Sequence, residues 1–305
     1  MTVGATVVTP YGGAEAMPST PTTTVGGVRR RLLLRRVVGA VLTSVGLLIV
    51  LLVLFVYAFT PLVAGRDQHR LLGTLTSSSQ NTFALTKGTM PAEGRPLGVL
   101  RIPALGLSQV VVAGTSAKDL VSGPGLMPGT VLPGEQGNAV IAGRRTTFGG
   151  PFGSIGTLHR GDVISVTDGV GAFRYVVASV RTVPSGERAF GGTTDDRLTL
   201  VTSNSSLDAT GLEMVVSHLV GRSVVTPASV SHAIPAGERG LSGQPLAAAS
   251  ALFWALLFLL AAAGTGFALW RWRRPWPTYL LAAPILLACG LFVVESVALM
   301  LPATV

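Results

Sequence analysis

Cysteine is almost absent from this sequence of 305 residues: only Cys289 is present, and it lies within a long apolar segment. One cysteine excludes a disulfide framework within the chain and any CxxC metal site. It also leaves residues 60–245 without a thiol. The four histidines are scattered without the spacing of metal ligands, so we expect no zinc site, no other metal and no cofactor.

Charged residues are also scarce, because they make up 12% of the chain against 48% for hydrophobic residues. This composition is too apolar for an ordinary soluble protein and predicts membrane segments. Three apolar runs, at 37–59, 246–270 and 278–300, each have the ~20 residues that cross the hydrocarbon core of a bilayer. We therefore expect three transmembrane helices in the plasma membrane.

The net charge of +9 reflects membrane topology, and we expect no nucleic-acid binding. Five arginines directly precede the first apolar run, and three follow the second run in "RWRR". Basic residues near span ends mark the cytoplasmic side, so the N-terminus is expected inside and residues 60–245 outside the cell. The first run could instead be a cleaved signal peptide. It is longer than a typical signal core and only the weak "LVAGR" follows it, which favours an anchor.

These observations divide the chain into eight expected segments. They are a disordered cytoplasmic tail (1–36), a first transmembrane helix (37–59), an extracytoplasmic linker (60–96), a globular domain (97–222), a second linker (223–245), a second transmembrane helix (246–270), a cytoplasmic turn (271–277) and a third transmembrane helix (278–300).

The globular segment has the pattern of a mostly β fold. Short β-branched runs such as "SQVVVAG", "DVISVTD" and "RLTLVTS" are separated by Gly, Pro or Asp, and several alternate in hydrophobicity. The best short helix is "SAKDLV", with Ser116 as its N-cap. Seven or eight strands with little helix predict a closed or nearly closed barrel rich in antiparallel pairs.

Four motifs in this segment carry a resemblance to a known family. In order, they are "LGVLRIPALGLSQVVVAGT", "GPGLMPGTVLPGEQGNAVIAG", "RTTFGGPFGSIGTLHRGDVISV" and "RLTLVTSN". Over about residues 97–220 the chain resembles the sortases, above all the membrane-anchored sortases of actinobacteria, which are high-GC Gram-positive bacteria. The resemblance implies an eight-stranded β-barrel and a transpeptidase that cuts a sorting-signal peptide and transfers its acyl group to an amine of the cell envelope.

The resemblance also implies a catalytic histidine, cysteine and arginine, and all three positions depart from the family. The histidine position is Arg144, the cysteine position is Ser203, and the arginine position is Leu212, or Glu213 after a slip of one residue. A guanidinium stays protonated and cannot act as a general base, and a serine needs such a base to become a nucleophile. Leu212 offers no hydrogen-bond donor for an oxyanion, and Glu213 has the wrong charge. We therefore expect a pseudoenzyme that retains the sortase fold.

Each of these positions has a structural and a functional interpretation. Ser203 is either a turn residue or a residual nucleophile. Arg144 either pairs with an acidic side chain or is solvated, or it joins Arg145 in binding a carboxylate or phosphate. The acidic candidates are Glu135, Asp195 and Asp196. The candidate binding set is Arg144, Arg145, Ser203 and Glu213.

The predicted spans carry candidate partner contacts. Gly264 and Ala268 form a small-xxx-small pair suited to close helix packing. Glu295 is a carboxylate about five residues from the outer end of the third span. It either faces protein or water within the membrane or reaches the headgroup region.

Together these features predict a catalytically inactive sortase-like membrane protein. Its barrel is expected to act as an extracytoplasmic binding or scaffold subunit, within a larger complex with other membrane proteins of the cell envelope. One alternative is a residual transpeptidase, acyltransferase or hydrolase that uses Ser203. Another is a binder of sorting-signal peptides, or of an anionic ligand, that regulates an active sortase.

Overall fold

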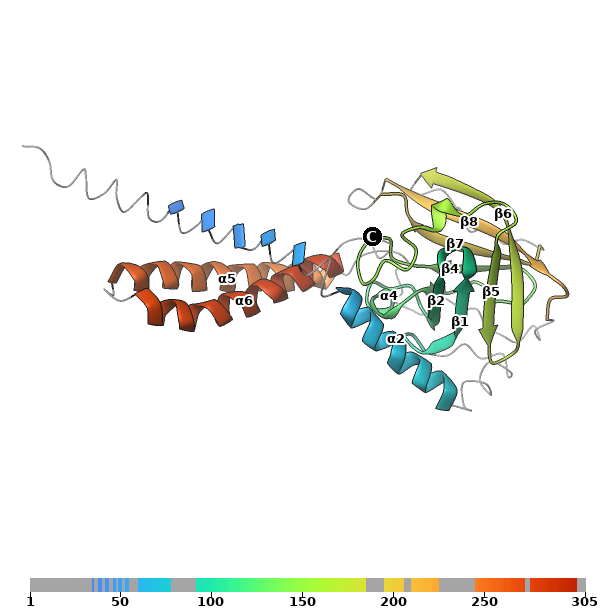
Figure 1. Cartoon of the computed structure of the whole chain (residues 1–305), viewed down its shortest axis with the longest axis horizontal. Coiled ribbons are helices and arrows are strands. Elements are labelled where there is room, and N and C mark those ends of the chain that lie inside the picture. The colour runs from blue at the N-terminus through green and yellow to red at the C-terminus, as the bar shows by residue number, and fades with distance from the viewer. Residues whose placement is uncertain are drawn as a thin grey trace, which may run out of the picture.

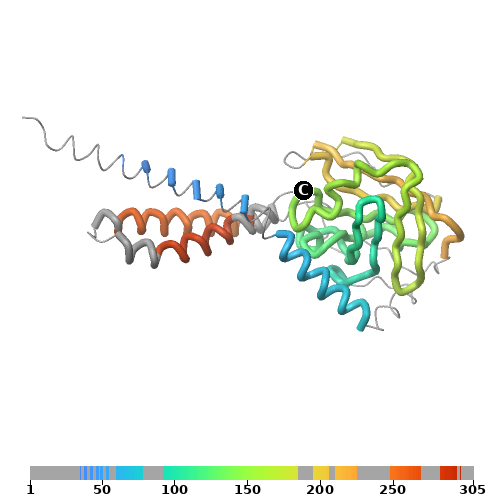
Figure 2. The backbone as a smooth tube through the Cα atoms, viewed as in Figure 1, coloured from blue at the N-terminus to red at the C-terminus, as the bar shows by residue number. Residues whose placement is uncertain are grey.

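A computed structural model describes the chain over six continuous segments and a few residues between 35 and 54. The segments are 60–77, 92–184, 195–205, 210–224, 245–271 and 275–300. Figure 1 shows a β-barrel beside a hairpin of two long helices, and the tube in Figure 2 follows the same backbone.

Eight strands close into a barrel in the order β1-β2-β3-β4-β7-β8-β6-β5, which confirms the predicted β-barrel. The strands are β1 Pro96–Ile102, β2 Leu107–Ala113, β3 Gly125–Leu126, β4 Asn138–Ala142, β5 Val163–Asp168, β6 Ala172–Pro184, β7 Arg197–Ser203 and β8 Gly211–Val220. Two neighbouring pairs, β2 with β3 and β4 with β7, are parallel, and the other pairs are antiparallel. The sheet is therefore mixed, although antiparallel pairing dominates.

The helical elements lie before, between and after the strands. They are α2 Thr60–Ser77, η2 Pro103–Leu105, α4 Asp119–Ser122, η3 Ile155–Thr157, α5 Pro245–Arg271 and α6 Pro275–Met300.

The barrel interior is filled by side chains that alternate along the strands. On β5, for example, Ile164 and Val166 are buried while Thr167 of the same strand is exposed. Strand β4 differs, because all five of its residues are buried. A strand that is covered on both faces reads as a continuous apolar run, as "NAVIA" does. Strand β4 therefore belongs to the centre of the fold, next to β7.

Helix α2 packs on the barrel, although it falls in the segment expected to be a linker (60–96). The side chain of Gln68 is buried against strand β2. Its Oε1 accepts a hydrogen bond from the Val110 amide (2.7 Å), and its Nε2 donates to the Val110 carbonyl (3.2 Å) and the Ser122 carbonyl (2.6 Å). Strand β3 pairs with β2 only at Val112 and Ala113, so Gln68 occupies the edge that β3 leaves open.

The predicted helix at 116–121 is shorter than expected and begins later. Helix α4 starts at Asp119, after Ser116 has formed a reciprocal pair with it. The Asp119 amide donates to Ser116 Oγ (3.3 Å), and Ser116 Oγ donates to the Asp119 carboxylate (2.6 Å). Ser116 thus acts through its side chain at the helix start, as a capping box does.

Helices α5 and α6 form a hairpin with its own apolar contact. The rings of Trp254 and Phe292 stack with their centroids 4.4 Å apart. In the same contact between the two helices, Ser250 Oγ donates to Ser296 Oγ (3.2 Å). The buried centre of the hairpin is formed by Phe258, Cys289 and Val293.

The expectation of three transmembrane helices is corrected to one candidate span within the described residues. Residues Ala248–Ala268 of α5 form a helix that is long and apolar enough to cross a bilayer. Among its described residues, helix α6 has a shorter apolar stretch, Ala282–Val293, which at ~1.5 Å per residue is less than the ~30 Å of a bilayer core. The first expected span (37–59) and the turn at 272–274 lie largely outside the described residues.

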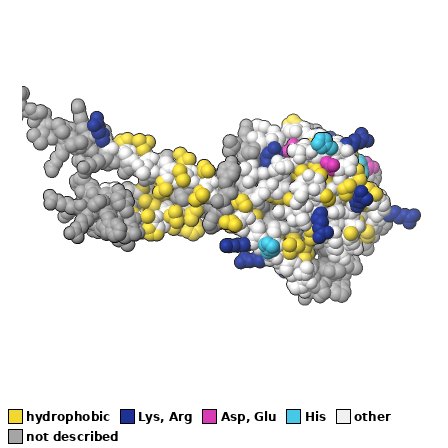
Figure 3. All heavy atoms as spheres, viewed as in Figure 1, with side chains coloured by type: hydrophobic (Ala, Val, Ile, Leu, Met, Phe, Trp, Pro, Cys, Tyr) yellow, Lys and Arg dark blue, Asp and Glu magenta, His cyan; other side chains and the backbone are white. Residues whose placement is uncertain are grey.

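Large apolar side chains cover the outer faces of the hairpin, as Figure 3 shows in yellow. The most exposed of those on α5 are Leu252, Phe253, Leu256, Leu259, Leu260 and Phe267. An apolar surface of this kind is stable in contact with lipid, which is consistent with membrane anchoring through α5.

Candidate functional site

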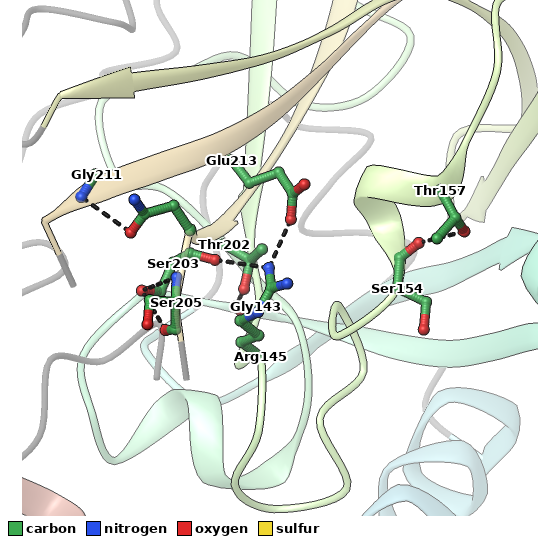
Figure 4. A network of polar contacts seen from close by, with 10 residues as sticks. Gly143, Arg145, Ser154, Thr157, Thr202, Ser203, Ser205, Gly211 and Glu213 are labelled. Carbon is green, nitrogen blue, oxygen red and sulfur yellow. Dashed lines mark hydrogen bonds and ion pairs between the residues drawn. The ribbon is translucent and has the colours of Figure 1, made fainter. Parts of the chain in front are cut away.

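The parallel pairing of β4 with β7 fixes the position of the candidate site. Ala142 lies in register with Val201 at the ends of the two strands. One residue further, the Gly143 amide donates to the Val201 carbonyl (3.0 Å), and Thr202 Oγ1 donates to the Gly143 carbonyl (2.9 Å). These bonds hold the start of the loop at 143–150 beside the end of β7 (Figure 4).

Arg144 is buried in this loop, with 0% of its surface exposed. Its guanidinium donates to Thr147 Oγ1 (2.9 Å) and to the Ala117 carbonyl (2.8 Å), and it lies 4.9 Å from the centroid of the Phe148 ring. Neither oxygen carries a formal charge. Desolvation lowers the pKa of Arg144 to about 10, so the side chain is still protonated at neutral pH.

This environment differs from the expectation that Arg144 is solvated or paired with Glu135, Asp195 or Asp196. Arginine is almost never fully buried without an acidic partner, so composition and spacing gave no reason to expect it. Desolvation is the cause of its pKa shift, and the nearest partners of its charge are dipoles and an aromatic ring.

The adjacent arginine, Arg145, points toward a different strand. Its Nη1 lies 2.6 Å from the Glu213 carboxylate and also donates to the Ser203 carbonyl (3.0 Å). Figure 4 shows the Arg145 guanidinium between Ser203 and Glu213, with a dashed contact to each. The structure thus brings three members of the candidate binding set together, while the Arg144 guanidinium faces the start of α4 instead.

Ser203 ends β7 and is fully buried. Its hydroxyl donates to the Ser205 carbonyl (2.9 Å) and lies 3.4 Å from the Ser205 amide, which donates to it. These bonds form a local turn of the kind that serine commonly makes after a strand. The Ser203 hydroxyl is therefore hydrogen-bonded to backbone groups of Ser205, and neither group is a general base.

Leu212 lies directly opposite Ser203 in the β7–β8 ladder, which places both on the same face of the sheet. That face carries a small apolar cluster outside the main core, against which Leu212 packs. Its members are Val140, Val183, Val201 and Met214, with Met127 at its edge. The resemblance assigns the cysteine position to Ser203 and the arginine position to Leu212, and these two residues are directly opposite one another on the strand pair.

The two histidines of the barrel, His159 and His218, are both exposed. His159 is exposed in the loop before β5. His218 is exposed on β8 and pairs with Arg197 at the opposite end of β7 from Ser203. Six residues of strand separate it from Leu212, or about 20 Å. Within the residues that the structure describes, no three His, Cys, Asp or Glu side chains gather in a way that could hold a metal ion.

Phe148 is a site residue that the sequence did not reveal. Its φ of 52° makes it the one described non-glycine residue with positive φ, in a region that bulky residues rarely adopt. Its ring is buried against Ala64 of α2, with Val121 and Leu291 at the edge of the same cluster. The following Gly149 and Gly150 also have positive φ, and this "GG" was the only local signal of an unusual turn.

The candidate partner residues of the hairpin have different settings. Gly264 is exposed, and a Cβ added there would meet nothing within 4 Å. Ala268 is half-buried. Gly264 is therefore open to a neighbour, and the role of the pair in packing against another helix stays a prediction. Glu295 belongs to α6, but its side chain is outside the described residues.

Comparison with known proteins agrees with the barrel. Residues 100–218 match the family described as the sortase domain. Sortase D of Bacillus subtilis (strain 168) is 30% identical over 122 residues, which span 40% of this chain and 59% of that relative. The chain thus covers less than two thirds of the length of this curated relative.

Three solved structures are similar to this chain. A sortase D transpeptidase of Clostridium perfringens has a TM-score of 0.46 and 21% identity, over 52% of this chain and 99% of that one. Sortase E of Streptomyces avermitilis has a TM-score of 0.39 and 29% identity, over 43% and 91%. Sortase C of Clostridium perfringens, solved with a C-terminal cell wall sorting motif, has a TM-score of 0.41 and 22% identity, over 51% and 90%. Because these TM-scores are below 0.5, the relationship rests on the sequence matches: residues 100–218 are similar to the sortase domain and to sortase D.

Proposed function

We propose that this protein is a sortase-like membrane protein without transpeptidase activity, whose barrel serves outside the cell as a binding or scaffold module. The observation that carries this proposal is the environment of Ser203. Its hydroxyl donates to a backbone carbonyl two residues away. A serine becomes a useful nucleophile only when a base accepts its proton, and a carbonyl oxygen cannot do so.

The other two positions support the same conclusion. Arg144 directs its donors away from Ser203, to Ala117 and Thr147, and remains protonated. Leu212 contributes a side chain to an apolar cluster and has no donor for an oxyanion. Arg145 is the nearby cation, but its Nη1 is already bonded to the Glu213 carboxylate and the Ser203 carbonyl.

The location and partners of this module follow from the helices. Helix α5 anchors the chain, and the arginines in "RWRR" keep the turn after it on the cytoplasmic side, so that the barrel lies outside. The exposed Gly264 face of α5 is the surface we assign to another membrane protein of the cell envelope.

A peptide-cleavage assay tests the loss of activity. The detergent-solubilised chain is incubated with a sorting-signal peptide and hydroxylamine as the acyl acceptor, and products are detected by mass spectrometry. We expect no hydroxamate product. Turnover that Ser203→Ala abolishes and Ser154→Ala leaves intact would establish a serine acyltransferase instead. Ser154 is a matched control because it is an exposed serine in the neighbouring loop.

The scaffold role has a separate test. Chemical cross-linking in intact membranes, followed by gentle solubilisation and purification, should return a defined membrane-protein partner linked to the barrel or to α5. Substituting Gly264→Leu should reduce that linkage, because the larger side chain prevents close helix approach. Recovery of the chain alone in every detergent tested would argue against the scaffold.

A further inference from the structure

We propose that the loop at 144–150 is a seat that fixes the helical hairpin to the barrel, with Phe148 as the contact residue and Arg144 as the residue that positions it. The resemblance assigns a catalytic base to this loop. In this chain the same loop joins three elements that are far apart in sequence. The inference does not depend on whether Ser203 has any activity.

The contacts of Phe148 connect the loop to both membrane-proximal elements. Its ring forms a buried cluster with Ala64 of α2, and Val121 of α4 and Leu291 of α6 pack against that cluster. Gly149 also lies close to α2, because a Cβ at Gly149 would lie 3.7 Å from the Ala64 side chain. Leu291 is the point at which the hairpin meets this loop, and Figure 1 shows the ends of α2 and α6 meeting beside the barrel.

The backbone of Phe148 indicates that this contact is specific. A phenylalanine with a φ of 52° is strained, and such a residue persists only where its surroundings fix it. An asparagine or a glycine would adopt this conformation more easily. The strained backbone places the Phe148 ring in a buried position. The ring is only 6% exposed and fills the space between the helices and the barrel.

Arg144 supplies the fixing contacts. It is four residues before Phe148, and its guanidinium lies over the ring at 4.9 Å. The same guanidinium donates to Thr147 within the loop and to Ala117 in the segment that leads into α4. A planar group with several donors can make all three contacts at once, which a shorter or single-point cation cannot. Arg144 thus holds the loop to α4 and presents the Phe148 ring toward α2 and α6.

Photo-cross-linking from α6 tests the seat in the full-length protein. Benzoylphenylalanine is incorporated in place of Leu291, the chain is irradiated in membranes, and cross-linked peptides are identified by mass spectrometry. We expect adducts within residues 146–150 and within the first turns of α2. In the Arg144→Ala background the yield of these adducts should fall about tenfold, which corresponds to a loss of ~1.4 kcal/mol in docking free energy. Arg144→Lys should restore part of the yield, because it keeps the charge without the full set of donors.

Two controls keep the test decisive. Arg145→Ala changes the adjacent arginine, which bonds to Glu213, and should leave the cross-link yield unchanged. Phe148→Asn removes the ring while accommodating the positive φ, so the barrel should stay folded and the adducts should still be lost. Unchanged adducts in Phe148→Asn, or in a folded Arg144→Ala protein, would overturn the proposal. Adducts of residue 291 only with lipid or with another chain would overturn it as well.

Discussion

The guanidinium of Arg145 and the carboxylate of Glu213 lie 2.6 Å apart, and they join the loop after β4 to strand β8. Both side chains are largely buried, with 23% and 18% of their surfaces exposed. Glu213 also lies close against η3, because a Cβ added at Gly156 would clash with its carboxylate. The ion pair therefore joins the loop after β4 to β8 in a closely packed space, where a side chain at position 156 would displace Glu213.

This geometry predicts strong coupling between the two residues. Arg145→Met leaves the Glu213 carboxylate without its cation and should lower the free energy of unfolding by about 1–3 kcal/mol. Glu213→Gln should cost less, because the Ser203 carbonyl still accepts from Arg145. The double variant Arg145→Met/Glu213→Gln should cost about 1–2 kcal/mol less than the sum of the two single changes. Urea unfolding followed by circular dichroism measures all of them, and strictly additive costs would contradict a direct interaction.

The burial of Ser203 predicts an unreactive thiol at this position. In a Cys289→Ala background, Ser203→Cys should be alkylated by iodoacetamide far more slowly than Ser154→Cys. The first thiol is buried beside an arginine whose charge Glu213 balances, and burial raises a thiol pKa above its usual ~8.5, whereas Ser154 is exposed. The rate of labelling against pH is the measurement. Fast labelling of Ser203→Cys at pH 7 would reveal a nearby base or cation that activates it.

We expect Asp168, at the end of β5, to make a pH-dependent contribution to the free energy of unfolding. Burial, together with the nearby Glu135 carboxylate, raises its pKa to about 6, against hydrogen bonds to the amides of Val170 (2.8 Å) and Gly171 (3.0 Å) that lower it. The folded state therefore holds the proton up to a higher pH than the unfolded state does. Consequently this residue's contribution to the free energy of unfolding falls as pH rises from about 4 through about 6.

Asp168→Asn isolates this effect. Both amides bond to Oδ1, an acceptor that asparagine keeps. The variant should match the wild type near pH 3.5 and exceed it by about 1–2 kcal/mol at pH 7.5, since it has no charge to desolvate. Asp168→Ala loses the acceptor as well and should not gain in this way. Thermal unfolding between pH 3.5 and 8 measures the difference, and a gain that does not vary with pH would refute the assignment.

We expect alanine substitution to lower the free energy of unfolding by different amounts at two glycines that have the same backbone requirement. Gly134 (φ 91°) and Gly161 (φ 100°) both lie in the left-handed region. A Cβ at Gly161 would meet nothing within 4 Å, whereas a Cβ at Gly134 would strike the ring of Phe173. Gly161→Ala should cost about 1 kcal/mol from strain alone, and Gly134→Ala should cost about 2–4 kcal/mol because the buried ring must also move. Adding Phe173→Leu to Gly134→Ala should recover part of the difference in unfolding free energy, and equal costs for the two glycines would contradict the packing seen at Phe173.

The barrel could be predicted from sequence because its strands carry their own patterns. Strands such as β5 alternate, and β4 is a continuous apolar run, so both are visible locally. Strand β3 is different, because it has only two residues and exists through its pairing with Val112 and Ile141. No local pattern could reveal it, and without it the parallel pairing of β2 could not be expected either.

The site was harder to predict because its geometry depends on tertiary contacts. Arg145 and Glu213 were both in the candidate set, but nothing in the sequence indicated that they bond to each other rather than to a ligand. Burial of Arg144 among neutral partners contradicts the usual preference of arginine, so only the folded chain reveals it. The conformation of Phe148 likewise results from a cluster whose members are contributed by three separate elements.

The hydrogen bonds of Gln68 to Val110 give helix α2 a role in preventing two barrels from pairing through their strand edges. Its side-chain amide occupies both hydrogen-bonding groups of a strand edge that two residues of β3 are too short to cover. A protein shortened to begin at β1 would present that edge to solvent, where the β2 edge of a second molecule could pair with it. Helix α2 thus protects this strand edge from pairing with another chain, and a soluble form of the domain should retain the helix from Thr60 onward.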